Sequence, residues 1–143
     1  MKHFLIIISC FFAFNQMLLA EETIDTPKSY QTDTLPDGTV VYLIPDTIAS
    51  FPGGVEEMHK FIRQNLKYPA IYMEAGIQGT VYLKMIIREN GEITNVVVVR
   101  SIDKWLDEEA IRVVRLMPNF IPAKVRGENV ASYFIMPVRF TLR

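Results

Sequence analysis

The chain has 143 residues, with 15 Lys and Arg against 16 Asp and Glu, and 50% of its residues are hydrophobic. This length suits one domain and leaves little room for a second, while the hydrophobic content argues against disorder. A formal net charge of -1 offers no broad basic surface to a phosphate backbone, so nucleic acid is not an expected partner.

The N-terminus has the pattern of a signal peptide. Residues 1–20 carry one formal charge, at Lys2, followed by an apolar run to Phe14 and a small residue, Ala20, before two glutamates. This order is typical of a cleaved secretory signal, with cleavage after Ala20 and export of the mature chain. An uncleaved membrane anchor is the first alternative, although the apolar stretch is short for crossing a bilayer. Lipidation at Cys10, the only cysteine, is the second.

Residues 21–50 form a leader that is rich in Thr, Asp and Pro, and its prolines are spaced so that no helix can run through it. Within the leader, the segment 33–44 joins a turn signal to residues of strand composition, which predicts a small hairpin or an added strand. The sequence Phe51-Pro52-Gly53-Gly54 then opens the compact domain, residues 51–143.

The first half of this domain combines a helical pattern with a hairpin pattern. Apolar residues recur at helical spacing from Val55 to Leu66 and stop at Tyr68-Pro69. Segment 80–88 alternates apolar and polar residues, as a half-buried strand does, and a second strand is expected at residues 93–100. Asn90-Gly91 between them is a strong hairpin signal and predicts two residues with positive φ.

The second half adds another helix and a last strand. Asp103 or a neighbour caps a helix whose apolar face extends from Leu106 to Met117, and its acidic residues 107–109 are expected to be solvated. The last strand covers residues 130–142. This order predicts an α+β fold: a three-stranded antiparallel sheet with two helices packed on one face. Pro137 cannot donate to a ladder, so the last strand is expected at a sheet edge.

No pattern in the sequence indicates an enzyme, a metal site or a cofactor. His59 is the only histidine after residue 20, and on the first helix it is expected to be a polar surface residue. The sequence has no nucleophile elbow, no zinc-protease motif and no phosphate-binding glycine loop. Trp105 is expected to pack in the core rather than to anchor a partner, and Met117 and Phe120 are expected in the core as well. Function is therefore expected to depend on an interaction surface.

The edge of the last strand is the expected surface, because an extended peptide can add a strand there. The alternative is that Pro137 and Arg139 protect this edge from aggregation. These two interpretations remain open on physical grounds alone.

Several short motifs occur in a characteristic order along residues 51–143. They are Phe51-Pro52-Gly53-Gly54, Tyr68-Pro69-Ala70, the runs 76–81, 90–93 and 106–112, Met117-Pro118, Ile121-Pro122-Ala123, Gly127 and the run 137–140. Together they resemble the TonB C-terminal domain family, in the variant that opens with Phe-Pro-Gly-Gly.

The resemblance implies a periplasmic domain that binds the TonB box, a short peptide of outer-membrane receptors, by strand addition. It also implies a role in energy-dependent transport of siderophores, vitamin B12 or glycans across the outer membrane, driven by an inner-membrane motor. In such domains the partner strand adds beside the last strand. The implied contact residues are Asn65, Leu66, Lys67, Tyr68, Pro69, Ser132, Tyr133, Phe134, Ile135, Met136, Val138 and Arg139.

Typical members of the family also have a membrane anchor and a long Pro-rich spacer. Here residues 21–50 would reach only about 100 Å if fully extended. Two hypotheses therefore stand: a TonB-like transport component, or a secreted or lipid-tethered periplasmic binding module without energy transduction. Inner-membrane motor proteins are expected partners only if the N-terminus is retained, and a homodimer is left open.

Overall fold

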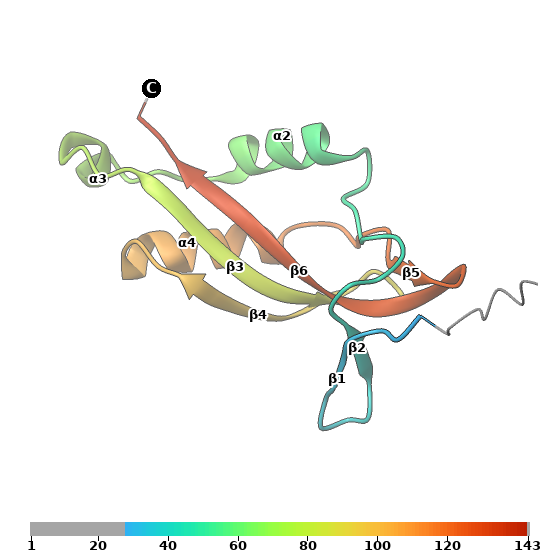
Figure 1. Ribbon diagram of the computed structural model, residues 1–143. Coiled ribbons are helices and arrows are strands. Elements are labelled where there is room, and N and C mark those ends of the chain that lie inside the picture. Colours follow the sequence, from blue (N-terminus) through green and yellow to red (C-terminus); the bar gives the residue numbers. More distant parts are fainter. Residues whose placement is uncertain (1–27, 143) are drawn as a thin grey trace, which may run out of the picture.

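The computed structural model describes residues 28–142, and the predicted signal peptide lies outside the described residues. Figure 1 shows a long curved sheet with helices beside it. The elements are β1 (Thr32–Thr34), β2 (Val40–Tyr42), α2 (Val55–Asn65), α3 (Ala70–Glu74), β3 (Gly79–Ile87), β4 (Ile93–Arg100), α4 (Lys104–Arg115), β5 (Ala123–Val125) and β6 (Glu128–Phe140). Within residues 28–142, no helix combines the length and apolar character that crossing a membrane requires.

The sheet is mixed and has six strands in the order β1-β2-β6-β3-β4, with β5 paired to β6. Its centre is the antiparallel pair of β3 and β6, which runs from Gly79 opposite Phe140 to Ile87 opposite Ser132. The predicted α+β class is confirmed. The predicted strand number is too low, because the hairpin β1–β2 and the short β5 extend the three-stranded core.

Helices α2 and α4 cover the same face of the sheet, as predicted (Figure 1). The alternation along the strands explains this layer, since every second residue is buried from Val81 to Ile87 in β3 and from Met136 to Phe140 in β6. The core joins these strand residues to Met58 and Ile62 of α2 and to the apolar face of α4, and it includes Met117 and Phe120, as expected. The five-residue helix α3, which begins after Pro69, was not predicted.

Helix α4 begins where its cap was predicted. The Asp103 carboxylate accepts a hydrogen bond from the backbone N–H of Trp105 at 2.9 Å, which satisfies one of the free donors of the first turn. The helix buries Leu106, Ala110, Val113 and Val114 at helical spacing. Apolar periodicity and a short polar cap therefore fix both the start and the orientation of this helix.

The turn between β3 and β4 differs from the predicted two-residue turn. Only Gly91 has a positive φ, 87°, and its N–H donates to the Arg88 carbonyl at 2.9 Å. Asn90 instead uses its side chain, which accepts a hydrogen bond from the Glu92 N–H at 3.0 Å. The prediction of two positive-φ residues is wrong, because this side-chain bond lets Asn90 stay in an ordinary conformation within a longer loop.

Candidate functional site

One side of β6 is open over most of its length. Strand β3 pairs along one side from Ser132 to Phe140, whereas on the other side β2 pairs only with Ala131 and Ser132. From Tyr133 to Phe140, no strand of the described part of the chain occupies that second side. The prediction of an edge strand is thus correct beyond Ser132 and wrong at Ser132 itself, where the strand has neighbours on both sides.

The register of β6 explains how it accommodates a proline. Main-chain groups of a strand point alternately to its two neighbours, and proline has no N–H to donate. Pro137, opposite Tyr82, keeps the β3 ladder intact only if its nitrogen faces the open side. The odd-numbered positions of β6 then direct their N–H and C=O groups to the open edge. Beyond Tyr133, the N–H donors on this edge belong to Ile135 and Arg139.

A groove of about 360 Å³ runs between α2 and this open edge. Its lining residues are His59, Ile62, Arg63, Pro137, Arg139 and Thr141, and they include no Asp or Glu. In residues 28–142, neither Arg63 nor Arg139 lies in an ion pair. The groove therefore combines unpaired main-chain groups with positive charge. His59, expected on the polar surface, is exposed and lies at its rim.

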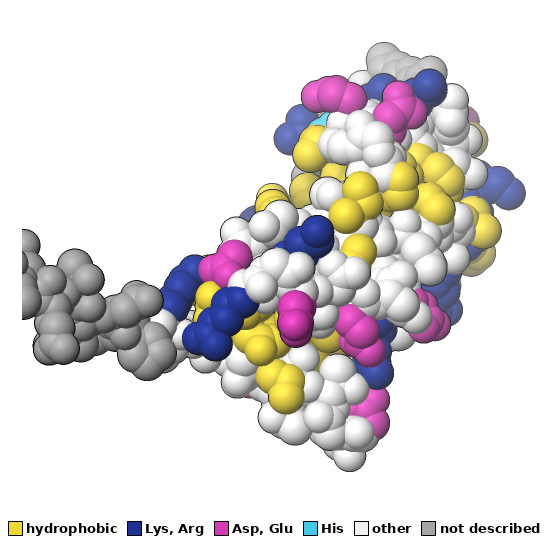
Figure 2. Space-filling view, turned by 90° about the vertical axis from the view of Figure 1, so that its right-hand side faces the viewer, with side chains coloured by type: hydrophobic (Ala, Val, Ile, Leu, Met, Phe, Trp, Pro, Cys, Tyr) yellow, Lys and Arg dark blue, Asp and Glu magenta, His cyan; other side chains and the backbone are white. Residues whose placement is uncertain are grey.

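One face of the molecule carries mixed charges. Figure 2 shows one face of the molecule on which hydrophobic side chains gather in a band, with basic and acidic side chains interspersed around it. No broad area of one sign appears on this face, in keeping with the near-neutral composition of the chain.

The side chains of β6 divide into two sets. Ser132, Met136 and Val138 are buried on the helix side, and Phe134 packs on the ring of Phe120. These predicted contact residues have no exposed side chain to offer a partner, because the two-residue period turns them into the core. By contrast, Ile135 is 59% exposed, and Arg139 is also exposed.

The second predicted group of contact residues, Asn65 to Pro69, is fastened to α4. Arg112 binds both carboxylate oxygens of Glu109, at 2.6 and 2.8 Å, and also donates to the Asn65 carbonyl at 2.7 Å. Glu109 in turn accepts the Lys67 N–H at 2.7 Å. The prediction that the acidic residues of this helix are solvated is therefore wrong for Glu109, whose side chain is 14% exposed.

Burial by itself would raise the pKa of Glu109. The hydrogen bonds from Arg112 and from the Lys67 N–H outweigh it, so the pKa of this carboxyl lies below its ordinary value of 4.5. The ionised form is thus the one that holds the end of α2 against α4.

The two predicted groups meet at one end of the sheet. The ring of Tyr68 packs edge-on against Phe140, with 5.6 Å between ring centroids. The Tyr68 hydroxyl is buried and has no hydrogen-bond partner among residues 28–142. Leu66 packs against the core and Lys67 is exposed. The segment 65–69 therefore packs against the core side of the C-terminal end of β6, while its side chains divide between core and solvent.

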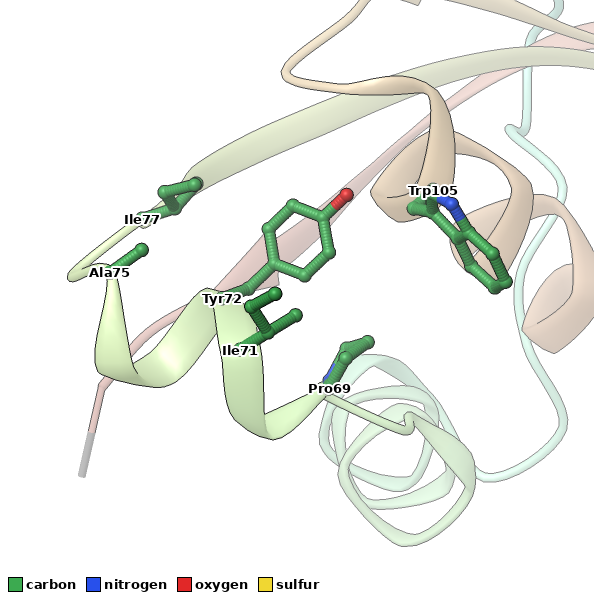
Figure 3. A pocket seen from close by; sticks show the side chains of 6 residues that line it. All are labelled: Pro69, Ile71, Tyr72, Ala75, Ile77 and Trp105. Atoms are coloured by element: carbon green, nitrogen blue, oxygen red, sulfur yellow. The ribbon is translucent and has the colours of Figure 1, made fainter.

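A second groove, which the sequence did not predict, lies between α3 and the start of α4 (Figure 3). It encloses about 520 Å³ and is lined by Pro69, Ile71, Tyr72, Ala75, Ile77 and Trp105. The Tyr72 hydroxyl points toward α4, where it donates to Asp103 at 2.6 Å. Trp105, expected in the core, is 67% exposed. The groove was missed because α3 was not predicted.

In residues 28–142, no three His, Cys, Asp or Glu side chains are grouped closely enough to hold a metal ion. The chemistry that this site offers is hydrogen bonding by a strand edge, together with the charges of two arginines.

Comparisons with known proteins identify the domain. Residues 64–142, more than half of the chain, match the family model for the Gram-negative bacterial TonB protein C-terminal. The Protein TonB of two strains of Xanthomonas campestris pv. campestris is 36% identical over 77 residues, which are 53% of this chain and 34% of the relative. The aligned segment thus spans about a third of the length of these relatives.

Solved structures of the Helicobacter pylori TonB C-terminal domain, determined by NMR in solution, are also similar. One matches with 22% identity and a TM-score of 0.48, covering 62% of this chain and 92% of that chain. Another has 23% identity and a TM-score of 0.45, covering 64% and 87%. On the strength of the family match over residues 64–142, the chain belongs to the family of Gram-negative bacterial TonB C-terminal domains.

Proposed function

We propose that this protein is a periplasmic, non-enzymatic TonB-like protein whose domain binds a short extended peptide by strand addition along β6, from Tyr133 to Phe140. The peptide is the TonB box of an outer-membrane receptor, and the binding serves energy-dependent transport across the outer membrane. The observation that supports this most directly is the open edge of β6, which is unpaired beyond Ser132.

The groove beside the edge supports the same proposal. A strand added to β6 would lie against α2, between the side chains of Arg63 and Arg139. Each main-chain hydrogen bond contributes about 1 kcal/mol net, so a few such bonds give only modest affinity. The two arginines would raise the affinity by attracting acidic side chains of the peptide. Because salt screens this attraction, the affinity is expected to fall as the salt concentration rises.

The test removes single N–H donors from the edge. Ile135→Pro and Arg139→Pro each delete an N–H that faces the open side and leave the ladder to β3 in place. In titration calorimetry with a synthetic TonB-box peptide, each variant is expected to bind at least about tenfold more weakly, because a bond is lost and the proline ring enters the path of the added strand.

Ile135→Thr is the matched control for the first variant, since it keeps both the N–H and a β-branched side chain. It should bind like the wild type, and the melting temperature of each variant verifies that the fold is intact. Unchanged affinity in both folded proline variants would overturn strand addition at β6.

The second role left open by the sequence is a periplasmic binding module that does not transmit energy. The mature N-terminus distinguishes the two roles, because only a protein that keeps residues 1–20 in the inner membrane can transmit force from a motor there.

A further inference from the structure

The hairpin β1–β2 lies on the same side of β6 as the open edge. Strand β2 runs parallel to β6, with Val41 opposite Ala131 and Tyr42 opposite Ser132. The hairpin therefore fills the positions immediately before the stretch to which we assign peptide binding. Any partner strand that extended past Tyr133 toward the start of β6 would meet Tyr42.

Apolar packing holds the hairpin in place. Val41 is fully buried in a small cluster with Ile86 and Ala131, and Leu35 and Tyr133 pack against this cluster. It is distinct from the main core. Because burial of an apolar side chain is stabilising, the packing of Val41 adds to the hydrogen bonds that attach β2 to β6.

Polar contacts add to this anchor. The Tyr133 hydroxyl donates to Asp33 at 3.0 Å, and Arg88 donates to Thr39 at 3.0 Å and to Asp37 at 3.3 Å. The backbone N–H of Thr39, and then its hydroxyl and Arg88, hold the pKa of Asp37 below its ordinary value. Strand β6 itself, through Tyr133, thus takes part in fixing the hairpin.

The chain leaves β6 directly after Tyr42. The N–H of Leu43 donates back to Gln31 within the hairpin, and Thr47 then pairs with Lys124 of β5. No described residue continues the line of β2 along β6. The edge is therefore closed up to Ser132 and open from Tyr133, with an abrupt boundary between the two parts.

We propose that the β1–β2 hairpin is a fixed stop that sets how far the bound strand extends toward the start of β6. This inference rests on the proposed strand addition. The open edge from Tyr133 to Phe140 has eight positions, about 26 Å of strand, and the hairpin lies at the end of this edge nearest the start of β6. A partner strand is thus prevented from sliding toward the start of β6.

The test detaches the hairpin in the full-length protein. Val41→Asp places a carboxylate in the apolar cluster and should release β2 from β6. Val40→Asp is the matched control, because it introduces the same charge one residue earlier, where the side chain is 44% exposed. Arg88→Ala is a second variant, which removes two hydrogen bonds to the hairpin without altering the apolar cluster.

The readout is amide hydrogen exchange with and without a synthetic TonB-box peptide. In the wild type and in Val40→Asp, the peptide should slow exchange at Ile135 and Arg139 and leave Ala131 unchanged, because β2 already covers it. In Val41→Asp, Ala131 should exchange fast in the free protein, and the peptide should slow it roughly fivefold to tenfold, the effect of about one net hydrogen bond. Arg88→Ala should show the same change to a smaller degree.

The outcomes separate this inference from the one on which it rests. Slowed exchange at Ala131 in Val41→Asp or Arg88→Ala, but not in Val40→Asp, supports the stop. If Ala131 exchanges fast in a released variant and the peptide still protects only Ile135 and Arg139, the stop is overturned and strand addition stands. If the peptide protects none of these amides in any protein, both proposals fail.

Discussion

Gly91 shows how one residue can connect a turn to the core. Its φ of 87° is in the region that favours glycine, and a Cβ built on it would lie 2.0 Å from the Phe120 carbonyl oxygen. The Gly91 carbonyl also accepts the Phe120 N–H at 2.8 Å. The backbone of the β3–β4 loop therefore rests directly on the segment after α4, and no side chain fits between them.

We expect Gly91→Ala to destabilise the protein by about 2–4 kcal/mol, because the substitution adds a backbone clash to the cost of a positive φ. Gly127→Ala is the control: it has a φ of 78° but open space around the new Cβ. It should cost only about 1 kcal/mol. Urea unfolding of both variants measures the difference, and equal losses would show that the contact with Phe120 is unimportant.

At the scale of elements, the hydrogen bonds of Glu109 and Arg112 join the end of α2 to α4. We expect Glu109→Gln to lower the free energy of unfolding by about 1–3 kcal/mol, since charge-assisted bonds to a half-buried group are lost. Glu108→Gln is the control, because its carboxylate is 60% exposed and lies 4.0 Å from Lys104. Its effect should stay near zero.

The stability difference between the wild type and Glu109→Gln is expected to depend on pH. The pKa of Glu109 is lower in the folded protein than its ordinary value of 4.5. Its stabilising contribution is therefore complete above about pH 4.5 and disappears as the pH falls through the lowered value. In urea titrations, the stability difference between wild type and Glu109→Gln should shrink on acidification. A difference that is constant with pH would mean that the carboxylate charge is not what stabilises the contact.

Helices and strands with regularly spaced apolar residues could be predicted from the sequence. Elements that depend on partners far along the chain could not. The period of two over residues 80–88 predicted β3, and the cap at Asp103 located the start of α4. Neither α3 nor β5 has enough residues for a period to appear, and both are held by neighbours far along the chain. The docking of β2 on β6 is also long-range, since Val41 carries no local signal that it pairs with Ala131.

The candidate site was predictable to the same extent. Pro137 correctly indicated that one side of β6 lacks a partner, because the absence of a donor N–H is a local property. The resemblance to the family implied residues 65–69 as contact residues, but the sequence did not show that Glu109 and Arg112 hold this segment in position. Nor did it show which of the contact residues turn their side chains into the core, although the alternation along β6 contains that information.

At the scale of the whole molecule, the first residues that the structure describes already contact the folded domain. Lys28 and Tyr30 both bind the Asp46 carboxylate, which also accepts the Arg126 N–H of the turn before β6. These hydrogen bonds, first of all the one from Lys28, lower the pKa of Asp46 to about 2. Asp46 is therefore ionised at physiological pH, and the contact places residue 28 close to the start of β6.

This geometry limits how far an anchored form of the protein could reach. Between Ala20 and the contact at Lys28 lie residues 21–27, which can extend over only about 25 Å. If residues 1–20 stayed in the inner membrane, the β6 edge would be held beside that membrane, far from a receptor in the outer one. A cleaved protein can diffuse to the receptor, although it cannot itself transmit force from an inner-membrane motor.

We therefore expect the mature protein to begin at Glu21 and to be found in the periplasmic fraction. Intact-mass spectrometry of the protein purified from that fraction measures the N-terminus directly. A mass that includes residue 1, in protein recovered from the inner membrane, would contradict cleavage and favour a role in energy transduction. A lipid attached to Cys10 would give a third, distinct mass. Substituting Ala20→Arg should block cleavage, since the site requires a small residue, and should move the protein to the membrane fraction.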